Sequence, residues 1–126
     1  MTDFKDEVDS RVLANTRDDM LLDSTQSFMR ASIAAMYSYN FSALGRPIIQ
    51  YPQDMVALQE IIWEVRPELI VETGIAHGGS LILSASMMAL LDYCDAVQAG
   101  QVLDPRATRR RGLGIDIDIR AHNRAA

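Results

Sequence analysis

The chain is poor in cysteine, in basic residues and in long apolar runs. Cys94 is the only cysteine among 126 residues, so an intrachain disulfide is excluded and the chain is compatible with a reducing cytosol. Twelve Lys and Arg against seventeen Asp and Glu give a net charge of -5, which argues against a nucleic-acid partner. No apolar stretch approaches the roughly 18 residues that a membrane span needs, and the acidic residues 1–10 are unlike a signal peptide. We therefore expect a cytoplasmic protein with no nucleic-acid partner and no membrane span.

Two isolated features invite a functional interpretation, and a structural one is simpler for both. Cys94 has no nearby His and acid in the sequence that would activate it, which favours an idle or buried thiol over a nucleophile. The run Arg109–Arg111 precedes an expected strand and indicates a solvated face or a helix cap, with an anion contact as the alternative. We assign neither feature a function.

The composition is that of one ordinary globular domain or part of one. Hydrophobic residues make up 48% of the chain and charged residues 23%. Apolar residues recur at helical spacing from about residue 4 to residue 39, with a break near residues 15–18. The spacing predicts an N-terminal helical cover over residues 1–40, followed by a second domain over residues 41–126.

The second domain is expected to begin irregularly and then form a helix. Gly45, Pro47 and Pro52 interrupt any periodicity over residues 40–54, which predicts an irregular segment. A helix is predicted from about residue 53 to residue 65, with Pro52 in its first turn and Pro67 beyond its end. Its expected buried stripe consists of Met55, Leu58, Ile61, Ile62 and Val65.

Two strands separated by a helix are predicted next. Residues 68–72 form a short apolar run suited to a central parallel strand, a helix is expected over residues 81–91, and residues 113–118 read as a second strand. A long polar connection is expected over residues 92–110. The order matches the first βαβ unit of a doubly wound, Rossmann-like α/β fold, in which ligands bind at the carboxyl ends of the strands.

Residues 71–80, VETGIAHGGS, place an acid and three glycines where the first strand ends. The spacing of Glu72, Gly74, Gly78, Gly79 and Ser80 differs from the G-x-G-x-x-G fingerprint that cradles a pyrophosphate. A carboxylate there would repel a pyrophosphate and suits a ligand with a positive amino group, such as S-adenosylmethionine. Asp116, at the end of the second strand, is placed to accept hydrogen bonds from ribose hydroxyls, and Asp118 would share its face in an ideal strand.

Simpler interpretations exist for each of these positions. Glu72 could cap the helix that begins near Gly79, the glycines could only make a tight turn, and Asp116 could be an exposed strand-end carboxylate. His77 could touch the cofactor or face solvent. No His, Asp or Glu spacing defines a metal site. The strand context on both sides favours binding over these alternatives.

The stretches GRPIIQYPQDMVALQEIIWEVRPELIVETGIAHGGS and GLGIDIDIRAHNR closely resemble the cephalosporin hydroxylase-like family of class I S-adenosylmethionine-dependent O-methyltransferases. The resemblance covers residues from about 37 to 126. It implies that Glu72, Gly74, Gly78, Ser80 and Asp116 line the cofactor site. It also implies that Gln50, in the segment before the helix, approaches the same pocket.

Members of the family extend further than this chain. The resemblance implies that the remaining strands, the catalytic base and the acidic ligands of a divalent metal such as Mg²⁺ lie outside it. A two-stranded sheet leaves an edge and apolar faces uncovered, so we expect a homo-oligomer or completion by a missing C-terminal half.

The leading hypothesis is therefore the cofactor-binding N-terminal portion of an O-methyltransferase acting on a hydroxyl of a sugar, glycolipid or secondary metabolite. The alternative is a non-catalytic interaction module that retains the βαβ unit. A nicotinamide-dependent oxidoreductase is disfavoured because the dinucleotide fingerprint is absent.

Overall fold

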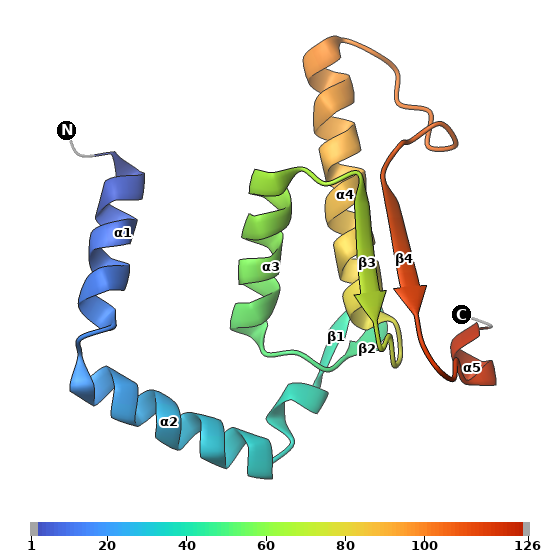
Figure 1. Cartoon of the computed structure of the whole chain (residues 1–126). Helices are drawn as coiled ribbons and strands as arrows, with labels where there is room; N and C mark the ends of the chain where they lie inside the picture. Colours follow the sequence, from blue (N-terminus) through green and yellow to red (C-terminus); the bar gives the residue numbers. More distant parts are fainter. Residues whose placement is uncertain (1–2, 125–126) are drawn as a thin grey trace. The chain divides into compact units, whose positions relative to one another are not determined.

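The computed structural model describes residues 3–124 (Figure 1). The chain divides into two compact units, Met1–Tyr37 and Ser38–Ala126. The sequence had suggested a division near residue 40. The second unit carries all the predicted site residues.

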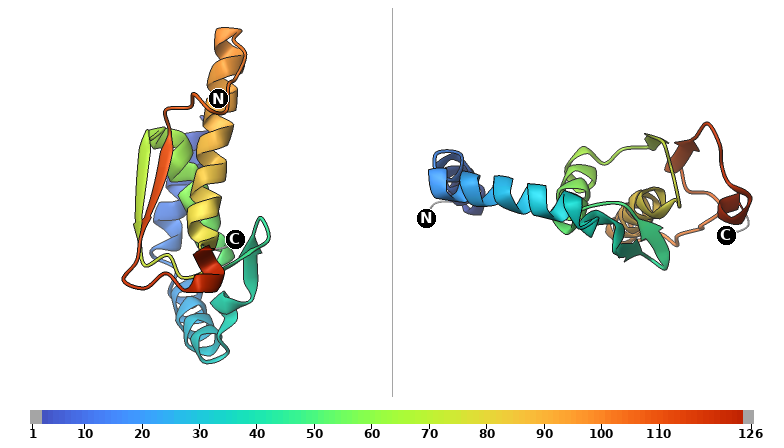
Figure 2. Two further views of the ribbon diagram at one scale, coloured as in Figure 1. Left: turned by 90° about the vertical axis from the view of Figure 1, so that its right-hand side faces the viewer. Right: turned by 90° about the horizontal axis from the view of Figure 1, so that it is seen from below.

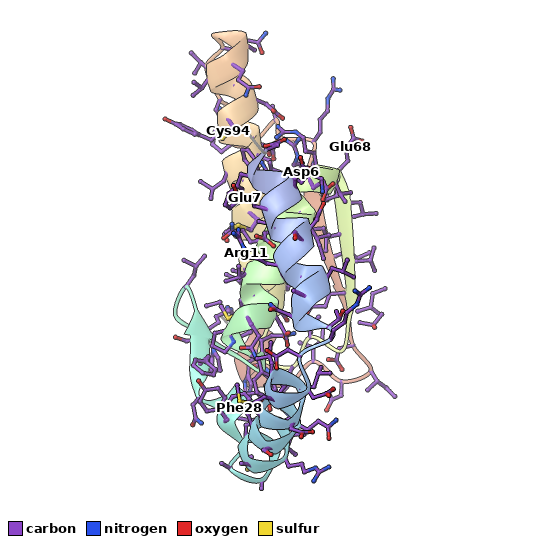
Figure 3. All side chains as sticks on the ribbon, turned by 90° about the vertical axis from the view of Figure 1, so that its left-hand side faces the viewer. Asp6, Glu7, Arg11, Phe28, Glu68 and Cys94 are labelled. Carbon is purple, nitrogen blue, oxygen red and sulfur yellow. The ribbon has the colours of Figure 1, made fainter. Side chains whose placement is uncertain are left out.

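The first unit contains two helices. They are α1 (Phe4–Asn15) and α2 (Asp19–Ala34), so the predicted break near residues 15–18 is confirmed. Asp18 caps α2 by accepting a hydrogen bond from the amide of Leu21 at 3.0 Å. Glu7 and Arg11 form an i,i+4 ion pair on α1, where both side chains are labelled in Figure 3. A short 3-10 turn, Tyr37–Tyr39, follows α2.

The second unit begins with a β-hairpin where the sequence had predicted an irregular segment. Strands β1 (Phe41–Ala43) and β2 (Arg46–Ile48) pair antiparallel through a two-residue turn. Both turn residues, Leu44 and Gly45, have positive φ, the geometry that matches the twist of hairpin strands. The prediction was wrong because Pro47 masks the strand pattern, although proline is tolerated in a short edge strand.

Helix α3 (Pro52–Val65) follows, with Pro52 at its first turn as expected. It ends at Arg66, which adopts a left-handed conformation. Only Ile62 of the predicted stripe is fully buried, whereas Ile61 and Val65 are more than half exposed. The stripe prediction was therefore too wide, because α3 packs mainly against one neighbour, α4.

The predicted βαβ arrangement is confirmed. Strands β3 (Leu69–Thr73) and β4 (Arg111–Ile115) are parallel and paired in register from Leu69 with Arg111 to Thr73 with Ile115. Helix α4 (Gly79–Ala99) connects them and lies along one face of the pair (Figure 2). A short helix, α5 (Ala121–Arg124), follows β4. The most buried apolar side chains of this unit are Ala43, Ile48, Ile62, Met88 and Leu91.

Helix α4 is eight residues longer at its C-terminal end than predicted. It ends at Ala99, with Gly100 in the left-handed cap, and the connection to β4 begins only there. At 21 residues, α4 is long and apolar enough by length and composition to cross a membrane, so the expectation that no stretch approaches this length was wrong. It packs against α3, the hairpin and β4.

Charged side chains explain why α4 continues past Leu91. Asp92 and Asp95 lie on its last turns and form ion pairs with Arg110, the latter at 2.9 Å, while Asp95 also pairs with Arg66. The side chains of Arg110 and Asp92 are only 13% exposed. The arginine run before β4, expected to be solvated, thus contributes one buried clamp between the end of α4 and the start of β4.

This clamp predicts acid sensitivity. The hydrogen bond from Arg110 holds the pKa of Asp95 below its usual value, against a smaller opposing effect of burial. A carboxyl whose folded-state pKa is depressed stabilises the fold above its unfolded pKa of about 4, and this contribution is lost as pH falls through the folded value. In urea unfolding, Asp95→Asn should have a lower free energy of unfolding than wild type at pH 7, and this difference should shrink as pH falls to 3. A difference that stays constant with pH would contradict the role of the ion pair.

One face of the β3–β4 pair is apolar and exposed. The side chains that point away from α4 are each about half exposed, and they are Leu69, Val71, Leu113 and Ile115. Parallel sheets are normally covered on both faces. Homo-oligomerisation, or completion of the sheet by further residues, stays a prediction that this face motivates.

Candidate functional site

A cavity of about 400 Å³ lies at the carboxyl end of β3. Its lining comes from the end of β2 and the residues after it, from Leu58 of α3, from β3, from the loop that follows β3 and from the first turns of α4. The volume is within the range of small-molecule sites, which is about 300 to 1,000 Å³. The topology places the cavity where parallel α/β units bind ligands.

The loop between β3 and α4 has an unusual backbone. Gly74 and Gly78 have φ of 76° and 79°, values that favour glycine. The amide of Gly78 donates to the carbonyl of Ile75 at 2.6 Å and closes a tight turn. Ala76, inside this turn, has φ of 44° although it carries a side chain. The loop is thus held in a conformation that its neighbours must stabilise.

Glu72 projects from β3 toward the start of α4. Its carboxylate Oε1 accepts a hydrogen bond from the hydroxyl of Ser80 at 2.5 Å. Of the described residues that line the cavity, Glu72 is the only Asp, Glu, Lys or Arg. The sequence interpretation of Glu72 as a cap of α4 is partly met, because its partner lies in the first turn, but the partner is a side chain and not a backbone amide.

Asp116 follows β4 and faces the backbone of the loop. Its Oδ2 accepts from the amides of Ile75 at 2.9 Å and Ala76 at 3.4 Å, and its Oδ1 accepts from the amide of Asp118 at 3.2 Å. These amides, that of Asp118 foremost, lower the pKa of Asp116 although burial opposes them. Asp116 and Asp118 both lie beyond the end of β4, so the predicted strand over residues 113–118 ends earlier than expected and the two acids share no strand face.

Gly79 permits close packing between the hairpin and α4. A Cβ at this position would lie 2.3 Å from the carbonyl oxygen of Pro47 and 2.8 Å from Cβ of Ile48. The hairpin therefore rests on the first residue of α4, and this contact brings Gln50 to the wall of the cavity. Gly79 has a packing role that the sequence reading as a cofactor contact did not foresee.

The structure brings most of the predicted site residues to one cavity. Those that line it are Gln50, Glu72, Gly74, His77, Gly79 and Ser80. Gly78 and Asp116 are not among the lining residues, because Gly78 caps α4 and Asp116 binds the loop from the β4 side. Sequence reasoning missed Ile49 and Ser84, which also line the cavity. Gly45 was the sequence signal for the hairpin, and recognising the hairpin would have placed Ile49, which follows β2, near the cavity.

No metal centre is visible in the part of the chain that the structure describes. Within residues 3–124, no three His, Cys, Asp or Glu side chains come together as a metal-binding group. Cys94 lies half-buried on α4, at the position labelled in Figure 3.

The βαβ unit defines a mixed α/β protein with a cavity at the carboxyl end of β3. Residues 35–126 match the rhamnosyl O-methyltransferase/CmcI family. The chain therefore belongs to this family, which indicates an O-methyltransferase of the CmcI type, and the resemblance read from the sequence is confirmed. No curated protein and no solved structure matched the chain.

Proposed function

We propose that this chain forms the cofactor-binding portion of an S-adenosylmethionine-dependent O-methyltransferase that acts on a hydroxyl of a sugar, glycolipid or secondary metabolite. The observation that carries the proposal is the single carboxylate in the cavity at the end of β3. Glu72 gives this cavity a negative charge, and among the residues that the structure describes no Lys or Arg lines it to offset that charge. Such a cavity favours a ligand with a cationic amino-acid end over one with phosphates.

The residues that line the cavity suit the amino-acid end of such a cofactor. Glu72, oriented by Ser80, would accept hydrogen bonds from the α-ammonium group. Gly74 has no atom within 4 Å of its missing Cβ, which leaves the loop backbone open to close approach by a ligand. Asp116, predicted from the sequence to accept from ribose hydroxyls, lies on the β4 side of the loop, where its carboxylate accepts from the loop amides, and is not among the residues that line this cavity.

S-adenosylmethionine, when bound, supplies an electrophilic methyl group to a hydroxyl acceptor. The residues of this chain would contribute positioning, which can account for a large share of the rate in transfer reactions. The proposal does not assign the acceptor pocket, or the base that deprotonates the hydroxyl, to residues of this chain.

Calorimetric titration tests the cofactor class. The chain should bind S-adenosylhomocysteine, which shares the ammonium and nucleoside parts of the cofactor, with a Kd in the micromolar range or tighter, about -8 kcal/mol. Parallel titrations with NAD⁺ should give no binding, because the carboxylate repels the pyrophosphate. Absence of S-adenosylhomocysteine binding, or tighter binding of NAD⁺, would contradict the proposed function.

A further inference from the structure

Three side chains from three different elements hold the loop between β3 and α4. Asp116, after β4, accepts from the amides of Ile75 and Ala76. Asn123, in α5, donates its side-chain amide to the carbonyl of Ala76 at 2.7 Å. Arg46, in β2, donates from Nη1 to the carbonyl of His77 at 3.0 Å. We infer that Arg46 and Asn123 are positioning residues that fix the loop backbone from outside the cofactor cavity.

The two positioning residues lie on the opposite side of the loop from the cofactor cavity. Arg46 and Asn123 line a second, smaller cavity of about 170 Å³ and are not among the residues that line the larger one. Both cavities share the loop residues Ile75, Ala76 and His77. The loop therefore separates the two cavities. Arg46 and Asn123, called the braces below, contact the loop on one side, and its other side is open to a ligand.

The guanidinium of Arg46 donates to the loop backbone and forms no ion pair with a described residue. Its side chain is half-buried, and no carboxylate of the described residues lies within ion-pair distance of it. A cationic donor forms a stronger hydrogen bond to a carbonyl than a neutral donor does. The guanidinium also lies 3.7 Å from the position of a Cβ on Gly78, which puts it against the last turn of the loop.

Asn123 completes the hydrogen bonding of the peptide groups around Ala76. The amide of Ala76 is taken by Asp116 and its carbonyl by Asn123, so the residue with the unfavourable positive φ is restrained on both sides. Strained backbone conformations persist when surrounding contacts over-determine them. Asn123 lies 47 residues away in sequence, so the restraint exists only in the folded unit.

The consequence for the ligand rests on the proposed function. A loop already fixed in its binding conformation loses little conformational freedom when a ligand binds, so affinity is higher than for a mobile loop. Loss of either brace should therefore weaken cofactor binding without removing any group that contacts the cofactor.

Amide hydrogen exchange of the full chain tests the inference directly. Asn123→Asp keeps the shape but removes the donor, and Arg46→Ala removes the other donor. In both variants the amides of residues 75–78 should exchange about tenfold faster, as expected for the loss of one hydrogen bond, while α4 amides and the thermal midpoint stay near wild type. Arg46→Lys should restore part of the protection, and the exposed Arg109→Ala is the matched control.

Loop exchange tests the positioning role of Arg46 and Asn123, and S-adenosylhomocysteine binding tests the proposed cofactor, so failure of one can be told from failure of the other. Unchanged loop exchange in Asn123→Asp and Arg46→Ala would overturn the positioning role, whatever the ligand does. Faster loop exchange together with about threefold to tenfold weaker S-adenosylhomocysteine binding supports both conclusions. Faster loop exchange in a chain whose wild type binds no S-adenosylhomocysteine supports the braces and defeats the proposed cofactor.

Discussion

Gly79→Ala should destabilise the second unit by about 3 kcal/mol, at the upper end of the usual cost of overpacking. The new Cβ would lie 2.3 Å from the carbonyl oxygen of Pro47 and 2.8 Å from its carbonyl carbon. Both are backbone atoms, so no side-chain rotation relieves the clash and β2 must move away from α4. Urea unfolding followed by circular dichroism gives the free energy of unfolding.

Gly112→Ala is the matched control for this change. Its added Cβ would meet Leu81 at 3.5 Å and Met88 at 3.7 Å, which are ordinary contacts with flexible side chains. The control should change the free energy of unfolding by less than about 1 kcal/mol. Equal effects of the two substitutions would show that the hairpin does not rest on α4 as the structure describes.

Glu72→Gln should weaken S-adenosylhomocysteine binding about 10- to 100-fold, the range expected for loss of a hydrogen bond to a charged group. Glutamine keeps the length of the side chain and an oxygen that can accept from Ser80, so the substitution removes the charge with little change in shape. The measurement is the Kd from calorimetric titration, with circular dichroism as the check that the variant folds.

Glu68→Gln is the control for the charge of the whole chain. Glu68 precedes the same strand at its opposite end and lines a different cavity. Its neutralisation should leave the Kd within about twofold of wild type, because an exposed charge at that distance is screened. A Glu72→Gln variant that binds as tightly as the Glu68→Gln control would mean that Glu72 does not contact the ligand.

Periodicity and strand context were enough to predict the βαβ unit. The short apolar run before Glu72 and the glycines after it placed β3, the loop and the start of α4 within a few residues of their observed positions. Ligand sites of parallel α/β units lie at the carboxyl ends of the strands, and Glu72 and Gly74 do line one cavity there.

Contacts between distant residues account for what the sequence did not show. The hairpin over residues 41–48 depends on two successive positive φ values, and Pro47 hides its strand pattern. The last two turns of α4 were predicted as a polar connection. The residue that pairs with Asp92 there, Arg110, lies 18 residues further along the chain, so local pattern does not show that Asp92 is buried in a helix. Both errors arise from tertiary contacts that override local pattern.

The two residues that hold the loop, Arg46 and Asn123, were not predicted from the sequence either. No role was assigned to Asn123 from the sequence, and Arg46 lies in a segment predicted to be irregular. Both act on backbone carbonyls 47 and 31 residues away, so no spacing pattern announces them. Asp116 lies one residue past the end of β4, whereas the strand was predicted to run to residue 118, and its partners are loop amides that only the folded unit reveals.

Backbone amide chemical shifts recorded during titration with S-adenosylhomocysteine test the central claim most directly. That claim is that the cavity at the end of β3 is the cofactor site. The largest shift changes are predicted at residues 72–80 and at Gln50, which surround this cavity. Changes confined to the cavity near Asp104 and Arg109, at the other end of the sheet, or the absence of any change, would contradict it.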